Sequence, residues 1–217
     1  MKKLLILSVF LAYGLNFHYF NGELRKLKSF AINEQNFYKK IDEEIKHREP
    51  RENPSVVFLG DSIMSGLRNH DLSLSNNVEN WAIAGDTSKL LLERLLEYNL
   101  QGIQSIHLMI GVNDLGRNAS VEEVITNLNF IIDLLSLCQC EIFLYSVLYT
   151  DGISRNNDII RQLNSLIDEL AELKSIKTVD LNWFVSEGEQ LKSKYTNDGL
   201  HLNQSGYELW INKLIRK

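Results

Sequence analysis

The feature that most constrains the fold is an alternation of short buried strands with helices, which begins after Pro54. Short continuous apolar runs that are rich in β-branched side chains and end at turn residues predict buried strands. The predicted strands span residues 55–60, 78–83, 105–110, 141–147 and 177–181. Strands that alternate with helices pair in parallel through right-handed crossovers, so we expect a three-layer α/β sandwich.

Patterns typical of helices fill the intervals between these strands. They lie at residues 90–96, 120–137, 155–173 and 204–215. Thr87 or Ser88 is the expected N-cap of the first helix, and Ser120 with Glu123 has the capping-box spacing that opens the second. Ligands of such sheets bind beyond the carboxyl ends of the strands, so the residues that follow each strand are the candidates for a functional site.

The composition excludes several classes of protein. The chain has 217 residues, of which 44% are hydrophobic and 24% charged, which excludes disordered, collagen-like and coiled-coil proteins. Its net charge of −5 shows no basic excess, so nucleic acid is not an expected partner. The two cysteines, Cys138 and Cys140, are too close to be expected to bridge, and we expect small apolar side chains in a helix-to-strand turn.

Residues 1–20 form an apolar segment with a positively charged start. Lys2 and Lys3 precede a run that extends from Leu4 to Leu15, which is typical of a signal peptide. The run is shorter than the roughly twenty residues that span a bilayer, no A-x-A-like cleavage site follows, and an aromatic rim suits a membrane interface. An uncleaved signal-anchor, a cleaved signal peptide and an N-terminal helix packed on the domain all remain open. We expect a membrane-anchored or exported protein, with a cytoplasmic location as the alternative.

Residues 21–52 are strongly charged and form the second part of the chain. Apolar residues recur there at helical steps, which predicts a helical lead-in; they are Phe30, Phe37, Ile41 and Ile45. The chain's only two prolines, Pro50 and Pro54, mark the break that follows. We therefore expect the main domain to span residues 53–217.

Five residues at the junctions between the predicted elements carry chemically useful groups. Ser62 follows the first strand and starts a helix, where the positive helix end favours an oxyanion. Gly85 follows the second strand and lets a ligand approach its N–H, and Asn113 follows the third with a neutral amide donor. Asp198 and His201 share a glycine-containing turn, in which the carboxylate can orient the imidazole toward Ser62.

Each of these residues alone is also explained as a helix cap or a turn residue. Together they resemble the SGNH (GDSL-type) hydrolase family, which is named after Ser, Gly, Asn and His in four separate blocks. The matching segments are Gly60-Asp61-Ser62, Asn80 to Thr87, Gly111-Val112-Asn113-Asp114 and Asp198-Gly199-Leu200-His201. Ala82, Ala84 and Val112 depart from the residues that are common in the family, and none of these changes removes a proposed catalytic group.

The resemblance implies a mostly parallel, flavodoxin-like sheet of five strands and a serine esterase without a metal or cofactor. Ser62 would be the nucleophile, His201 the general base and Asp198 the residue that orients it. The N–H groups of Ser62 and Gly85 would form the oxyanion hole with the Asn113 side chain.

Further residues near these blocks are candidates for supporting roles. Asp86 and Thr87 beside the oxyanion glycine are candidate substrate contacts, and so is Trp183, for which core packing is the alternative. Asp61 is expected to bond N–H groups of the nucleophile turn, and Asp114 to cap its loop.

The expected reaction is hydrolysis of a carboxylic acyl ester through an acyl-enzyme. The substrate is expected to be a small O-acyl ester, such as an acetyl group on a carbohydrate, or a lysophospholipid-type ester. An acyltransferase that uses the same acyl-serine and a non-catalytic binding module are the alternatives.

Overall fold

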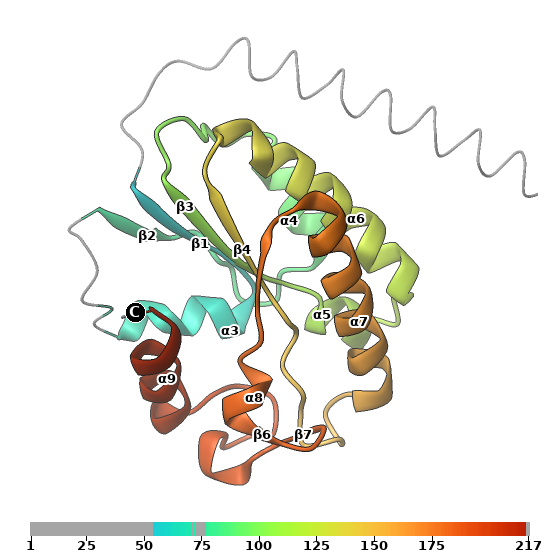
Figure 1. Cartoon of the computed structure of the whole chain (residues 1–217). Helices are drawn as coiled ribbons and strands as arrows, with labels where there is room; N and C mark the ends of the chain where they lie inside the picture. The colour runs from blue at the N-terminus through green and yellow to red at the C-terminus, as the bar shows by residue number, and fades with distance from the viewer. Residues whose placement is uncertain (1–53, 71, 73–76, 216–217) are drawn as a thin grey trace, which may run out of the picture. The chain divides into compact units, whose positions relative to one another are not determined.

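The computed structural model describes residues 54–70, 72 and 77–215 (Figure 1). The predicted apolar segment 1–20 and the lead-in 21–52 lie outside the described residues, so the expectations for them stay predictions. No helix of the described residues is long and apolar enough to cross a membrane.

Five parallel strands form the central sheet in the order β2-β1-β3-β4-β5. The strands are β1 (Val56–Gly60), β2 (Val78–Asn80), β3 (Ser105–Met109), β4 (Glu141–Tyr145) and β5 (Lys177–Val179). This is the flavodoxin-like order, in which the chain reverses its direction of growth between β1 and β3. The predicted fold class is confirmed, and the predicted site lies at the carboxyl ends of these strands.

Seven α-helices surround the sheet in the described part of the chain. They are α3 (Ser62–Ser65), α4 (Ser88–Leu95), α5 (Val112–Gly116), α6 (Val121–Leu135), α7 (Asn157–Lys174), α8 (Asn182–Val185) and α9 (Gln204–Trp210). Helices α4, α6 and α7 cover one face of the sheet, and α3 and α9 lie on the other (Figure 1). A short hairpin of β6 (Ser186–Glu187) and β7 (Gln190–Leu191) follows α8.

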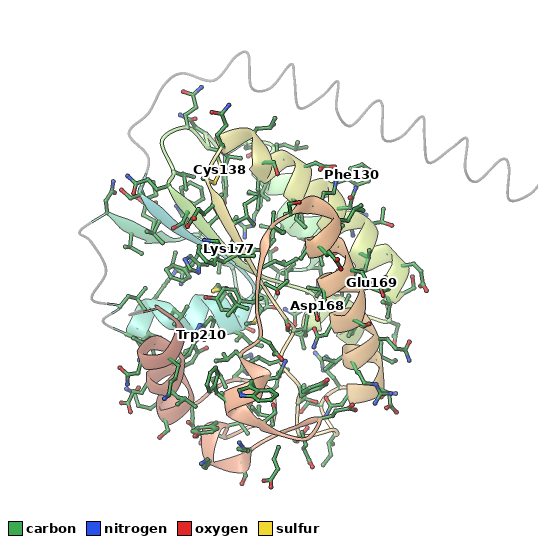
Figure 2. All side chains as sticks on the ribbon, in the orientation of Figure 1. Phe130, Cys138, Asp168, Glu169, Lys177 and Trp210 are labelled. Carbon is green, nitrogen blue, oxygen red and sulfur yellow. A yellow bond between two sulfur atoms is a disulfide. The ribbon has the colours of Figure 1, made fainter. Side chains whose placement is uncertain are left out.

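The core follows from the alternation of side chains along each strand. On one face of β1 and β3, Val57, Leu59, Ile106 and Leu108 are fully buried. On the other face, Tyr145 of β4 meets Trp210 of α9, whose side chain points toward the sheet, with the ring centroids 5.5 Å apart (Figure 2). Both faces of the sheet are therefore covered near the carboxyl ends of the strands.

The predicted helix starts agree with the structure. Thr87 is the N-cap of α4, where its Oγ1 accepts a hydrogen bond from Leu90 N at 3.3 Å. Ser120 Oγ accepts from Glu123 N at 3.1 Å at the start of α6. The last predicted helix is α-helical only to Trp210 and continues as a π-helical turn over Ile211–Ile215.

The prediction that the two cysteines do not bridge is wrong, because Cys138 and Cys140 form a disulfide. The bond does lie in the predicted helix-to-strand turn, at the end of β4 that is remote from α9 (Figure 2). Gln139 adopts the left-handed conformation, with φ 55° and ψ 32°, and this bend brings the two Cα atoms to 5.2 Å. That separation is ordinary for a disulfide, but the sequence spacing does not reveal the bend that produces it.

Candidate active site

Ser62 stands at a sharp turn between β1 and α3. Gly60 before it has φ 146°, and a Cβ atom there would lie 2.0 Å from the carbonyl oxygen of Met109. Only glycine therefore fits between the two neighbouring strands at this point. Asp61 is the N-cap of α3, and its Oδ1 accepts a hydrogen bond from Ile63 N at 3.0 Å, as predicted. The turn places Ser62 at the start of a helix, half-buried beyond the carboxyl end of the sheet.

The structure brings Ser62, His201 and Asp198 into one chain of hydrogen bonds. Ser62 Oγ lies 2.9 Å from His201 Nε2, and His201 Nδ1 lies 2.6 Å from Asp198 Oδ2. Asp198 Oδ1 also accepts from the N–H groups of Leu200 at 2.9 Å and His201 at 2.8 Å. Partial desolvation alone would raise the pKa of Asp198. The hydrogen bonds, chiefly those from His201, lower it by more, so the pKa lies well below the ordinary value. The carboxylate therefore stays ionised beside the imidazole.

Tyr207 of α9 joins the region after His201 to α3, the helix that carries Ser62, through a contact that the sequence did not predict. Its hydroxyl donates to the carbonyl oxygen of Ile63 at 2.8 Å. A Cβ atom at Gly66 would lie 2.0 Å from the same hydroxyl oxygen, so the close approach requires glycine. The pairing of α3 with α9 is thus fixed one turn away from Ser62.

A second unpredicted contact holds the turn that carries Asp198. Asp151 N donates to the carbonyl oxygen of Gly199 at 2.8 Å. The Asp151 side chain packs so closely that a Cβ atom at Gly199 would lie 2.1 Å from its Oδ2. Gly199 has φ 78°, which is a second reason for glycine at this position.

Gly85 and Asn113 lie at the same edge of the sheet as Ser62. Ile83 N donates to the carbonyl oxygen of Gly60 at 2.9 Å, so the loop that carries Gly85 runs beside the nucleophile turn. Asn113 Nδ2 donates to the carbonyl oxygen of Asp86 at 2.9 Å, and Arg117 Nη2 donates to that of Gly85 at 2.9 Å. Asn113 on α5 and Arg117 after it thereby hold the loop around Gly85, which is the proposed oxyanion loop. No pattern in the sequence indicated this role of Arg117.

The three candidate substrate contacts differ in their surroundings. Asp86 is buried, and its Oδ2 pairs with Arg94 Nη2 at 2.7 Å, while Thr87 caps α4. Both side chains are therefore engaged within the fold. Trp183 on α8 is 82% exposed, which excludes the alternative that it packs in the core.

Asp114 lies within α5 rather than capping a loop as predicted, and its carboxylate bonds the start of α4. It accepts hydrogen bonds from Ser88 N at 3.0 Å and from Ser88 Oγ at 2.6 Å. Burial raises the pKa of Asp114, and the bonds from Ser88 act in the opposite direction. This contact joins α5, which carries Asn113, to α4, which follows Gly85.

Asp61 is an unusual carboxyl because it is only 1% exposed. Burial raises its pKa from 3.8 to about 7, although the Ile63 N–H bond opposes the shift. Its Oδ2 has no hydrogen-bond partner among the described residues. Near neutral pH this carboxyl is therefore divided between its neutral and ionised forms.

Solved structures from the GDSL and acylhydrolase group share this fold. A Streptococcus pneumonia protein described as a platelet activating factor is 28% identical, with a TM-score of 0.68, over 90% of this chain and 97% of that chain. A lipase/acylhydrolase from Enterococcus faecalis is 25% identical, with a TM-score of 0.60, over 74% of this chain and 93% of that chain. The acetylxylan esterase Axe2 from Geobacillus stearothermophilus has a TM-score of 0.60 at 18% identity, over 75% of this chain and 93% of that chain, and supports the fold alone.

Sequence comparisons give a curated relative and a family. An N-acylneuraminate cytidylyltransferase from Streptococcus agalactiae is 30% identical over 196 residues, which cover 85% of this chain and 45% of that protein. This chain thus spans less than half the length of that relative. The model of the GDSL-like lipase/acylhydrolase family matches residues 58–209, which include all four sequence blocks. The chain therefore belongs to the GDSL-like lipase/acylhydrolase family, which is a family of hydrolases.

Proposed function

We propose that the chain is a serine esterase that removes small O-acyl groups from a carbohydrate through an acyl-enzyme. The observation that carries this proposal is the unbroken path from Ser62 Oγ through His201 to Asp198. A serine hydroxyl is a weak nucleophile by itself, and a base within hydrogen-bond distance is what activates it.

In the first half of the reaction, His201 Nε2 takes the proton of Ser62 as the serine oxygen attacks the ester carbonyl. Asp198, which is ionised, stabilises the imidazolium that forms. The alcohol then leaves with the proton from His201, and the acyl group stays on Ser62. Water repeats the sequence in the second half: His201 accepts a proton from the water, the acid leaves and Ser62 recovers its proton.

The negative charge on the carbonyl oxygen needs preorganised donors. The N–H groups of Ser62 and Gly85 and the side-chain amide of Asn113 are the proposed set. An amide nitrogen has two N–H donors. Asn113 uses one of them on the carbonyl oxygen of Asp86, which orients the side chain and leaves the second for the substrate.

Polar surroundings support a sugar ester over a lysophospholipid. Two cavities of about 440 and 420 Å³ are lined by residues that follow and precede Gly85 in the chain, and their walls are mostly charged and polar side chains. Such walls suit hydroxyl groups better than an alkyl chain. The name of the Streptococcus agalactiae relative also refers to a sugar, an N-acylneuraminate.

The test of the proposal combines one variant with a chain-length series. Ser62→Ala should abolish hydrolysis of p-nitrophenyl acetate and labelling by a fluorophosphonate probe. The matched control is Ser65→Ala on the same helix. The Ser65 hydroxyl accepts a hydrogen bond from Arg68, and its loss should leave both hydrolysis and probe labelling intact. Hydrolysis by Ser62→Ala at the parent rate would refute the assignment.

Esters of increasing acyl length separate the two substrate classes. We expect activity to be greatest with acetyl esters, and a maximum at long chains would favour the lysophospholipid class. Acetylated xylo-oligosaccharides and O-acetylated N-acetylneuraminate are the sugar esters to compare. Transfer of the acyl group to an added sugar at a rate above hydrolysis would instead indicate an acyltransferase.

We also infer that the domain functions outside the cytoplasm. The apolar segment at residues 1–20 supports this location, and so does the Cys138–Cys140 disulfide, because such bonds persist in oxidising compartments. Recovery of the full chain in the soluble cytoplasmic fraction, with both thiols reduced, would contradict the inference.

A further inference from the structure

The cavity of about 420 Å³ is lined in part by Ile83, close in sequence to Gly85, and none of the proposed catalytic residues lines it. Its walls include the aromatic residues Trp81 and Tyr98 and the apolar Ile83. Polar side chains complete the lining, among them Glu97 and Asn99. The cavity thus combines flat aromatic surface with hydrogen-bonding groups.

The two aromatic rings are held in fixed orientations. Their centroids are 5.0 Å apart with an interplanar angle of 67°, the edge-to-face arrangement that aromatic pairs prefer. Arg94 lies over the Tyr98 ring and donates from Nη1 to its hydroxyl at 2.8 Å. Trp81 Nε1 donates to Glu79 Oε2 at 2.5 Å. Rings fixed in this way offer a surface to a ligand without the cost of ordering them.

The cavity lies within reach of the nucleophile. Trp81 N donates to Phe58 O at 2.8 Å and Ile83 N to Gly60 O at 2.9 Å, so this segment extends along β1 toward Ser62. Trp81 precedes Gly85 by four residues, which places the two Cα atoms at most about 14 Å apart. Ile83, which lies between them, is 48% exposed. A ligand in the cavity would therefore continue toward the reacting ester.

The charges around the cavity favour a neutral ligand. Arg68, which also lines it, donates to the carbonyl oxygens of Asn80 and Ala82 along the edge of β2. Its Nη1 donates to Ser65 Oγ at 3.2 Å. Arg94 is paired with Asp86. Because both guanidinium groups are engaged in the fold, they are poorly placed to bind a phosphate or carboxylate.

We propose that this cavity is a saccharide subsite, which holds a neutral pyranose ring of the alcohol part of the substrate. The C–H face of a pyranose stacks on an aromatic ring, while its hydroxyl groups bond to amides and carboxylates such as those of Asn99 and Glu97. The proposal rests on the proposed esterase function, since it names the part of the substrate that lies beyond the acyl group.

The kinetic test compares a sugar ester with a substrate too small to occupy the cavity. For Trp81→Ala, the ratio of kcat/KM on acetylated xylotriose to kcat/KM on p-nitrophenyl acetate should fall about tenfold, through a higher KM. Trp81→Phe keeps an aromatic face and should recover part of the loss. The control is Leu173→Ala, an exposed apolar residue on α7, which should leave the ratio unchanged.

A binding measurement separates this proposal from the esterase function. Unacetylated xylotriose is titrated into Ser62→Ala protein, and Trp81→Ala in that background should weaken binding about tenfold. A protein that binds xylotriose through Trp81 but hydrolyses no ester would support the subsite and refute the esterase. The subsite would be overturned if Trp81→Ala and the parent had the same ratio of kcat/KM on acetylated xylotriose to kcat/KM on p-nitrophenyl acetate, while circular dichroism showed that both are folded. It would also be overturned if Trp183→Ala, rather than Trp81→Ala, lowered the ratio.

Discussion

Replacing Asp61 with asparagine tests the consequence of burying a carboxyl beside the nucleophile. Asp61 accepts one hydrogen bond, from Ile63 N, and burial raises its pKa from 3.8 to about 7. Asparagine is an equally good N-cap and keeps the acceptor for Ile63 N, but it cannot ionise. The substitution therefore removes the titration and retains the turn.

The magnitude follows from the pKa shift. Between about pH 4 and pH 7 the folded protein holds a proton on Asp61 that the unfolded chain has released, so the free energy of unfolding falls as the pH rises. At about 1.36 kcal/mol per pH unit, the shift from 3.8 to about 7 amounts to about 4 kcal/mol. This loss is absent below about pH 4 and complete above about pH 7. Asp61→Asn should match the parent at low pH and exceed its stability by up to about 4 kcal/mol at about pH 8.

Urea unfolding from about pH 4 to pH 8 measures this difference. Asp180→Asn is the matched control, because Asp180 Oδ1 accepts from Asn182 N at 2.9 Å at the start of α8 while the residue is exposed. The control should follow the parent at every pH. The reasoning is refuted if the difference between Asp61→Asn and the parent does not grow with pH.

Three further predictions concern the oxyanion hole, the α3–α9 contact and the disulfide. Asn113→Ala should lower kcat by a factor on the order of 10²–10³ without changing the circular dichroism spectrum, and a loss below about tenfold would contradict its role. Gly66→Ala should destabilise the protein by about 1–3 kcal/mol in urea, because the new Cβ meets the Tyr207 hydroxyl, and an unchanged midpoint would contradict that packing. Replacing Cys138 and Cys140 with serine should cost only about 1.5–2 kcal/mol, the entropy of closing so short a loop. A loss above about 3 kcal/mol would refute that estimate.

The strands and helices were predictable because their signals are local. A buried parallel strand such as β1 is a continuous apolar run, and α6 begins at a capping residue that its own sequence supplies. The strand ends were less predictable. The prediction extended β4 to Val147, but both backbone groups of that residue pair with the side chain of Asn164 on α7. The end of this strand depends on a side chain 17 residues away, so the residues of the strand alone do not predict it.

The candidate site likewise has features that the local sequence predicts and contacts that it does not. Ser62 and the Asp198–His201 turn lie in short segments whose residue types suggest their chemistry. The contacts that position them, from Tyr207 to Ile63 and from Asp151 to Gly199, join segments that are far apart in the chain. Such contacts depend on how the helices pack, and no spacing within either segment encodes them. The Cys138–Cys140 bond was missed for a related reason, since it depends on one left-handed residue.

The hydrogen bonds of Asp198 have a consequence for how activity responds to heat. The acid–base pair is built within four consecutive residues, because Asp198 bonds both the ring and the backbone N–H of His201. The bond from His201 to Ser62, by contrast, spans 139 residues and depends on distant contacts such as that between α9 and α3. If heat loosens those distant contacts before it breaks the local bonds, the imidazole and its carboxylate separate from the serine as an intact unit. Inactivation on heating should therefore precede the loss of the sheet and reverse on cooling.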